Sequence, residues 1–274
     1  MLTVSSLRKV FGGRGWKAPA VTALESISFD IGKGESLGVV GESGSGKSTL
    51  GRLVSRLIDP TAGQILFERT DIGAISPSAF VHRPERRRIQ HIFQDAAENL
   101  TPHMTAFAAI ADPLRRLLGL TDVGQRVREL ADSVSLSRDL LERYPHQLSG
   151  GQKARVGIAR GLASQPSLLI LDEPTAALDV SVQAAILKLL HRLRRDLGLS
   201  YLLISHDIEV VRLTCERIII LRNGQVVEAG RTADVLAAPQ SEYGCTLLAA
   251  VPRLKSSAGM LPTDDNPGER INPR

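Results

Sequence analysis

The pattern of apolar and polar positions divides the chain into short apolar runs and longer segments with helical spacing. The runs at 36–40, 168–171, 201–204 and 218–221 are rich in Val, Ile and Leu, which predicts buried strands. After Asp179, aliphatic residues recur on one side of a segment whose other positions carry Lys and Arg, which predicts an amphipathic helix. Helices between buried strands are typical of an α/β fold whose parallel sheet is covered on both faces.

Two regions depart from this alternation. Residues 1–35 predict two edge strands, antiparallel to each other and joined by the Gly-rich turn GGRG. Residues from about 95 to 165 carry helical patches without a strong strand signal, and Pro102, Pro113 and Pro145 are expected to break helices there. The second region therefore predicts a helical insertion in the α/β core.

Composition and charge narrow the function classes. Hydrophobic residues make up 43% and charged residues 23%, as in ordinary globular proteins, while 4% aromatics disfavour a stacking platform for single-stranded nucleic acid. A net charge of +5 suits a protein that holds polyanions such as nucleotides or lies near an anionic membrane face. The basic run at 83–88 is interpreted as a solvated surface. Cys215 and Cys245 lack metal-site spacing and are expected to be free thiols.

The ends of the chain indicate neither export nor a membrane span. The N-terminus has no long apolar region and does not look like a signal peptide. Every apolar run is far shorter than the ~18 residues of a membrane helix, so we expect a soluble chain whose membrane role would come through partners. After Pro252 the sequence is polar and contains Pro and Gly, which predicts a mostly disordered tail at 252–274 behind a domain at 1–251.

A glycine-rich segment, GESGSGKST, lies between a predicted strand and a predicted helix and matches the pattern G-x-x-x-x-G-K-[ST]. Its glycines let backbone N–H groups close around phosphate oxygens, Lys47 can reach the β- and γ-phosphates, and the Ser48 hydroxyl can bind Mg²⁺. An ordinary strand–helix turn is the alternative. The predicted nucleotide-binding residues here are Gly41, Glu42, Ser43, Gly44, Ser45, Gly46, Lys47, Ser48 and Thr49.

A second motif, LLILDEP, ends an apolar strand with the adjacent carboxylates Asp172 and Glu173. An Asp at a strand end beside a phosphate loop is well placed to hold Mg²⁺, and the neighbouring Glu can then polarise an attacking water. Taken alone, the motif would equally suit a solvated acidic strand end before a proline turn. The phosphate loop upstream favours the catalytic interpretation.

The third motif, LSGGQ, precedes a helical pattern. Ser149 and Gln152 have the spacing of a capping box, which would suffice for a purely structural helix start. Gly150 and Gly151 are unfavourable at the first helical positions, however, and they leave bare N–H groups at the positive end of a helix. The motif therefore predicts a second anion-binding surface.

With these motifs in this order, the chain up to about residue 251 resembles the nucleotide-binding subunits of ABC transporters, in which LSGGQ is the signature. The resemblance implies an α/β P-loop NTPase core with an N-terminal antiparallel β subdomain and an inserted α-helical signature subdomain. It also assigns Gln94 to a catalytic and metal-binding loop, Asp179 to the D-loop and His206 to the switch. Phe11 matches the residue that stacks on adenine, with Trp16 nearby as the other candidate.

The resemblance implies a working cycle. Two such domains pair head to tail, and each ATP lies between the phosphate loop of one subunit and the signature of the other. ATP closes this dimer and hydrolysis opens it, while the segment after Gln94 transmits the movement to a membrane subunit. Two departures accompany the match. Ala176 stands where the D-loop commonly has Ser, and the loop after Gln94 lacks the usual aromatic and serine.

The end of the chain narrows the resemblance to the oligopeptide, dipeptide and nickel importer ATPases, through EAG at 228–230, Pro239, Tyr243 and LLAAVP at 247–252. This branch implies a second ABC ATPase subunit, two transmembrane permease subunits and an extracytoplasmic solute-binding protein. It implies a peripheral place at the cytoplasmic face of the membrane, with no nucleic acid bound. The alternative is an accessory ATPase of a soluble enzyme complex, such as phosphonate-degrading machinery.

Overall fold

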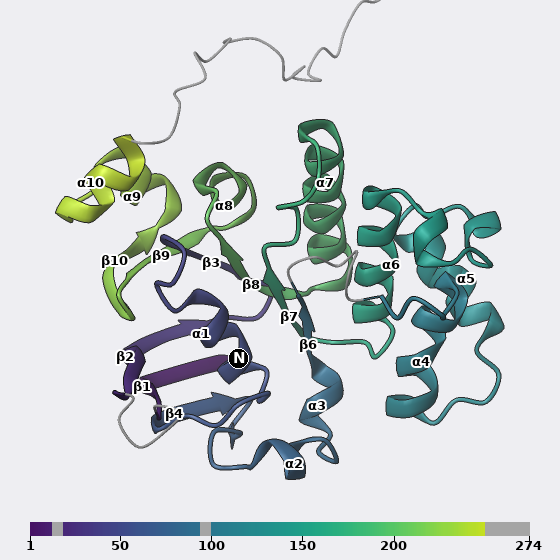
Figure 1. The fold of residues 1–274 in the computed structure, drawn as a ribbon, viewed down its shortest axis with the longest axis horizontal. Helices are drawn as coiled ribbons and strands as arrows, with labels where there is room; N and C mark the ends of the chain where they lie inside the picture. The colour runs from purple at the N-terminus through teal and green to yellow at the C-terminus, as the bar shows by residue number, and fades with distance from the viewer. Residues whose placement is uncertain (13–18, 94–99, 250–274) are drawn as a thin grey trace, which may run out of the picture.

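The computed structural model describes residues 1–12, 19–93 and 100–249, which form two β-sheets and a group of helices (Figure 1). The strands are β1 Leu2–Phe11, β2 Val21–Ile31, β3 Ser36–Val40, β4 Ala62–Phe67, β5 Thr70–Asp71, β6 Ile89–Ile92, β7 Leu168–Asp172, β8 Ser200–Ser205, β9 Arg217–Arg222 and β10 Gln225–Arg231. The helices are α1 Lys47–Val54, α2 Pro77–Phe80, α3 Glu85–Arg88, α4 Ala106–Leu118, α5 Gly124–Ser133, α6 Gly150–Leu162, α7 Val180–Leu197, α8 Ile208–Thr214, α9 Thr232–Ala237 and α10 Glu242–Ala249, with 3₁₀ turns at Arg138–Leu140 and Pro145–Gln147. The predicted α/β class is confirmed.

The central sheet has the order β10-β9-β3-β8-β7-β6 and is parallel except for β10, which pairs antiparallel with β9. All four predicted strands are present, each within one residue of the expected ends. In β7, Leu168 and Ile170 enter the core shared with α1 and the smaller sheet, while Leu169 and Leu171 enter the core shared with the helices on the other face. Because both faces are buried, the strand is apolar up to its last residue, Asp172.

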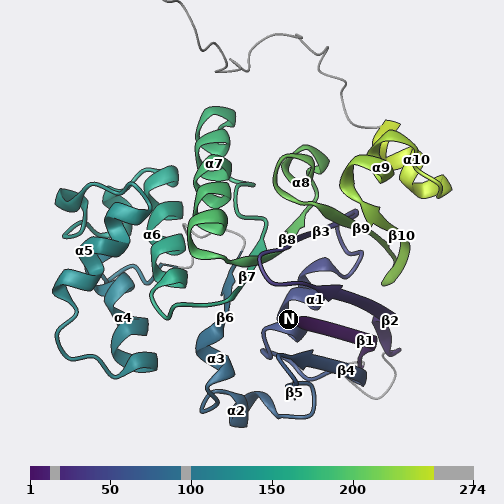
Figure 2. The ribbon, with the colours of Figure 1, turned by 180° about the vertical axis from the view of Figure 1, so that it is seen from behind.

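The smaller sheet has the order β2-β1-β4-β5, and β1 and β2 pair antiparallel as predicted. The prediction that both are edge strands is wrong for β1, which lies between β2 and β4 because β4 pairs with its other side. Alternate residues of β1, including Leu2 and Val4, are buried beneath the sheet, and α1 lies between the two sheets (Figures 1 and 2). The expected GGRG turn lies partly within residues 13–18, which are outside the described residues. The predicted tail at 252–274 is also outside them.

The predicted helical insertion comprises α4, α5 and α6, which lie together at the side of the central sheet formed by β6 and β7 (Figures 1 and 2). Pro102 lies in a turn and Pro145 begins a 3₁₀ turn, but the expectation that Pro113 breaks a helix is wrong. It lies inside α4, among the buried residues Ile110 and Leu114. Burial of this amphipathic face outweighs the roughly 3 kcal/mol that an interior proline costs a helix.

The basic run at 83–88 is only partly the solvated surface that the sequence predicts. Arg83 and Arg87 are exposed, whereas Arg86 and Arg88 of α3 are half-buried and Arg88 makes a bidentate ion pair with Glu68. The two cysteines are free thiols, as expected.

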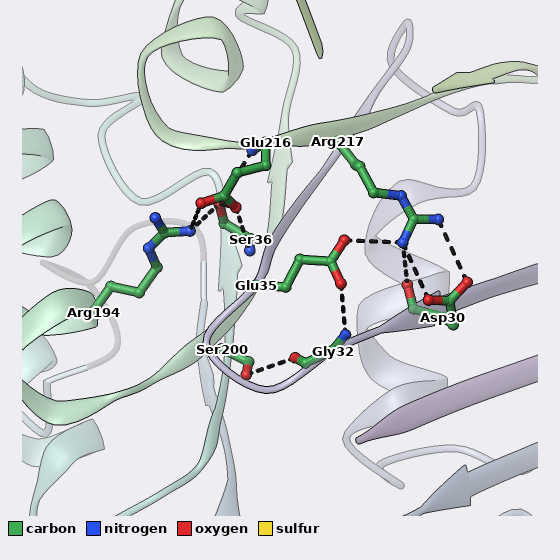
Figure 3. Close-up of polar contacts among 8 residues, drawn as sticks. All are labelled: Asp30, Gly32, Glu35, Ser36, Arg194, Ser200, Glu216 and Arg217. Carbon is green, nitrogen blue, oxygen red and sulfur yellow. Dashed lines mark hydrogen bonds and ion pairs between the residues drawn. The ribbon is translucent and has the colours of Figure 1, made fainter. Parts of the chain in front are cut away.

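A polar network anchors the start of β3, opposite the end that leads into the glycine-rich loop (Figure 3). The Arg217 guanidinium donates to Glu35 at 2.9 Å and to Asp30 at 3.2 Å, which ties β9 to the turn between the two sheets. Beside it, Glu216 accepts hydrogen bonds from Ser36 and from Arg194 of α7. These contacts fix where β3 begins and therefore where the loop at its other end emerges.

Candidate nucleotide-binding and catalytic site

The glycine-rich loop joins β3 to α1 in a conformation that needs glycine. Gly44 and Gly46 have φ of 81° and 105°, in the left-handed region that residues with a Cβ rarely adopt. A Cβ on Gly41 would lie 2.1 Å from the Leu221 carbonyl oxygen, and one on Gly46 would lie 2.5 Å from the Ala23 carbonyl oxygen. The loop thus packs closely against the backbone of β2 and β9. No side chain caps the first turn of α1. This is the geometry of a phosphate cradle at a helix N-terminus.

Lys47 bends back over this loop. Its Nζ donates to the carbonyl oxygens of Gly41 at 2.6 Å and Glu42 at 2.8 Å, and the residue is 7% exposed. Burial lowers the pKa of Lys47, and the carboxylates of Glu173 and Asp172 act in the opposite direction. The ammonium group therefore lies between the glycine-rich loop and the acidic pair, where it can neutralise phosphate oxygens.

The side chains of Ser48 and Asp172 contact each other because the last residue of β7 lies beside the first turn of α1. The Ser48 hydroxyl donates to Asp172 Oδ1 at 3.2 Å. Burial raises the pKa of Asp172, while the Ser48 hydrogen bond lowers it. A hydroxyl and a carboxylate are hard oxygen ligands of the kind that Mg²⁺ prefers. No group of three His, Cys, Asp or Glu side chains suited to a metal occurs in the described part of the chain, and Mg²⁺ typically takes few protein ligands beside substrate phosphates.

Glu173 and His206 form the other side of the site. Glu173 Oε1 accepts the backbone N–H of His206 at 2.8 Å and lies 2.9 Å from His206 Nδ1. Glu173 has a φ of 49°, an unusual conformation for a residue with a side chain, and Ser205 lies 3.4 Å from its other oxygen. Glu173 is 9% exposed, whereas the His206 side chain is 64% exposed. The pair therefore joins a shielded carboxylate to an imidazole that faces solvent.

Several of these groups line one cavity of about 350 Å³, although Gly41, Glu42 and Asp172 do not. Its lining residues are Val21, Thr22, Ala23, Ser43, Gly44, Gly46, Lys47, Ser48, Thr49, Glu173 and His206. The sequence did not predict that Val21, Thr22 and Ala23 line the cavity, since nothing in the sequence of β2 distinguishes the residues that lie beside the glycine-rich loop. Phe11 is 42% exposed and does not line the cavity, but it pairs in the β1–β2 register with Val21, which does.

The signature residues lie elsewhere in the chain, at the start of α6. The predicted capping box is present: Ser149 Oγ accepts the Gln152 N–H at 3.3 Å, and Gln152 Oε1 accepts the Ser149 N–H at 2.8 Å. A Cβ on Gly151 would lie 2.6 Å from Val182 Cγ1, and Asp179 caps α7 beside it. Among the described residues, the lining of the cavity does not include Asp179 or any of the four signature residues Ser149, Gly150, Gly151 and Gln152.

Gln94 and Trp16 lie outside the described residues. Ser45, predicted to bind nucleotide, is buried within the loop, and its carbonyl oxygen accepts the Gly224 N–H at 2.9 Å.

Tyr243 has a contact that the sequence did not predict. Its hydroxyl accepts the Glu42 N–H at 3.2 Å, so α10 touches the glycine-rich loop.

A strand–loop–helix cradle with a lysine, beside a strand ending in Asp-Glu, defines a P-loop ATPase, and the separate LSGGQ helix start defines the ABC class. The chain belongs to the ABC transporter family, whose model matches residues 24–176. It binds nucleotide and is an ATPase of this class.

Similar proteins carry related names. A peptide import ATP-binding protein of Brucella ovis is 43% identical over 258 residues, which cover 92% of this chain and 78% of that protein. The oligopeptide transport ATP-binding protein OppF of Lactococcus lactis is 40% identical over 85% of this chain and 73% of its own length. The solved dimeric structure of the ATP-binding cassette MJ0796 bound to ADP and Pi has a TM-score of 0.74 and 31% identity, covering 85% of this chain and 99% of that one.

Proposed function

We propose that this chain energises a membrane importer of peptides, or of nickel and related small solutes, by binding and hydrolysing ATP. The observation that carries the ATPase part is the cavity that Lys47, Ser48, Glu173 and His206 line together. The names of the relatives in Brucella and Lactococcus, which match most of the chain, support peptide uptake.

Within the site, the loop at 41–49 and Lys47 hold the phosphates, and Phe11 stacks on the adenine. The protein ligands of Mg²⁺ are Ser48 and Asp172, joined by Gln94, and the hydroxyl–carboxylate pair fits such an ion. Bound there, Mg²⁺ neutralises charge that develops on the phosphate oxygens. Glu173 orients and polarises the attacking water, and His206 holds the Glu173 carboxylate in place through its backbone N–H and ring.

The site is completed by a second subunit. The signature residues Ser149, Gly150, Gly151 and Gln152, with Asp179, lie at helix starts outside the cavity, so they can serve a nucleotide only across an interface. The dimeric state of the cassette MJ0796 supports this arrangement. The partner is a second ABC ATPase subunit, identical or not.

The remaining partners are two transmembrane permease subunits and, indirectly, an extracytoplasmic solute-binding protein. The chain lies at the cytoplasmic face of the membrane as a peripheral subunit. No helix among residues 1–12, 19–93 and 100–249 is long and apolar enough to cross a bilayer. Energy would reach the membrane through the segment that follows Gln94.

Substituting Glu173 tests the catalytic part. Glu173→Gln keeps an oxygen that can accept the His206 N–H, so we expect nucleotide affinity and folding to be retained. Loss of the base should lower ATP turnover by roughly 10²–10⁴-fold. Turnover near that of the wild type would remove Glu173 from this role.

Purification of the tagged chain from gently solubilised native cells tests the transport part, together with uptake of labelled peptides by cells that lack it. Recovery of two polytopic membrane proteins and a second ATPase, with loss of peptide uptake, supports the proposal. Recovery of soluble enzymes alone, with normal uptake, would retain the ATPase and reject the importer.

A further inference from the structure

His91 is a buried histidine on β6 whose ring points toward the metal-binding end of the site. In the parallel pairing of β6 and β7, His91 lies opposite Ile170. Asp172 follows Ile170 by two residues and therefore shares its face of the sheet. His91 Nε2 lies 3.9 Å from Asp172 Oδ2, and the two side chains are only 4% and 6% exposed. An imidazole thus stands directly behind the carboxylate that faces Ser48.

The surroundings hold this ring in one place. Phe93 stacks on it, with ring centroids 4.1 Å apart and planes inclined by 14°. On the other side, α1 approaches closely because Gly51 has no side chain; a Cβ there would lie 3.2 Å from His91 Cε1. Ser55 Oγ lies 3.0 Å from His91 Nδ1. The ring therefore has little freedom to turn away from Asp172.

The second ring nitrogen is the unusual feature. Nε2 is fully buried and has no hydrogen-bond partner among the described residues. A buried polar atom without a partner is unfavourable because it has lost its hydrogen bonds to water, so a partner within reach is expected. Asp172 Oδ2 is such a partner, because closing the gap by roughly 1 Å gives a normal hydrogen bond. The carboxylate torsion of Asp is soft enough to allow that movement.

The proton on the ring belongs on Nε2. A bare nitrogen lone pair facing a carboxylate oxygen would be repelled, whereas an Nε2–H donates to it. Nδ1 then accepts from the Ser55 hydroxyl, which turns to it from the Gly51 carbonyl oxygen 2.8 Å away; that carbonyl keeps the Ser55 backbone N–H at 3.0 Å. Burial, with the positive charges of Arg52 and Arg86, lowers the pKa of His91.

We propose that His91 is a positioning residue that holds one oxygen of Asp172 through its Nε2–H, so that the other oxygen faces Ser48 and the Mg²⁺ bound there. This inference rests on the metal-binding role proposed above for Asp172. His91 fixes the orientation of the ligand and does not contact substrate or metal. It also links the end of α1, through Ser55, to the end of β7.

Three variants of the full chain separate this role from packing. Gln in place of His91 can present an amide N–H where Nε2 stands, Asn can reach only toward Ser55, and Leu keeps bulk without a donor. Binding of Mn²⁺ in the presence of ATP is followed by electron paramagnetic resonance, and ATP affinity is measured separately in EDTA. We expect His91→Asn and His91→Leu to weaken Mn²⁺ binding roughly tenfold, with metal-free ATP affinity retained. His91→Gln should bind Mn²⁺ nearly as well as the wild type.

The outcomes distinguish this inference from the role on which it rests. Wild-type metal affinity in His91→Asn and His91→Leu would overturn it, as would equal losses in all three variants, which would indicate packing alone. Asp172→Asn serves as the reference. If it leaves Mn²⁺ binding unchanged, both the metal role of Asp172 and the inference fail. If it weakens binding while the His91 variants do not, the inference alone fails.

Discussion

Gly151, the second residue of α6, allows packing and chemistry at the signature to be separated. A Cβ at this position would lie 2.6 Å from Val182 Cγ1 on α7, far inside a normal contact. Overpacking of this kind costs about 1–3 kcal/mol, while Ala recovers up to about 1 kcal/mol of helix propensity relative to Gly. We therefore expect Gly151→Ala to lower the free energy of unfolding by about 1 kcal/mol and to tilt α6, with loss of ATPase activity.

Val182→Ala removes the clashing methyl group and leaves Val182 Cβ, 3.9 Å away, as an ordinary neighbour. In that background Gly151→Ala should be neutral or slightly stabilising, which corresponds to a coupling energy of about 1–1.5 kcal/mol between the two sites. Gly150→Ala is the matched control. Its nearest neighbour is the flexible end of Leu178, at 3.1 Å, so little change in stability is expected.

Urea unfolding of the four members of the cycle gives the coupling energy, and ATP turnover at saturating nucleotide gives the activity. Because the added methyl would point at α7, the Gly151 N–H stays free, and the double variant should regain turnover together with stability. A coupling energy below about 0.5 kcal/mol would refute the packing argument. Restored stability without restored turnover would show that the nucleotide itself needs the space beside Gly151.

Three further substitutions test other contacts. Lys47→Ala removes charge-assisted hydrogen bonds worth about 1.5–3 kcal/mol, so calorimetry should show ATP binding weakened at least tenfold; unchanged affinity would contradict the phosphate-loop role. Phe11→Ala should weaken ATP binding by about 1 kcal/mol through lost stacking, and an effect seen only in Trp16→Ala would move the adenine contact there. Tyr243→Phe removes the acceptor of the Glu42 N–H, so urea unfolding should show a loss of about 1 kcal/mol; no loss would mean that water replaces the hydroxyl.

Much of the fold could be predicted because its signals are local. The β7 run is apolar along its whole length, and this alone predicted a strand buried on both faces. Ser149 and Gln152 predicted their capping box from spacing, since a helix start is decided within one turn. Pro113 shows the limit of local signals, because the burial of α4 against its neighbours overrides the preference of a single residue.

The candidate site divides in the same way. The glycine-rich loop, the Asp172–Glu173 pair and the signature helix start are contiguous motifs, and the sequence by itself determined their local backbone and predicted their chemistry. Only the tertiary structure decided that Val21 lines the cavity, that His91 stands behind Asp172 and that Tyr243 touches the loop. Each of these contacts joins segments far apart in the chain. They depend on strand order and helix packing, which follow from the burial of the whole core and leave no mark on any short stretch of sequence.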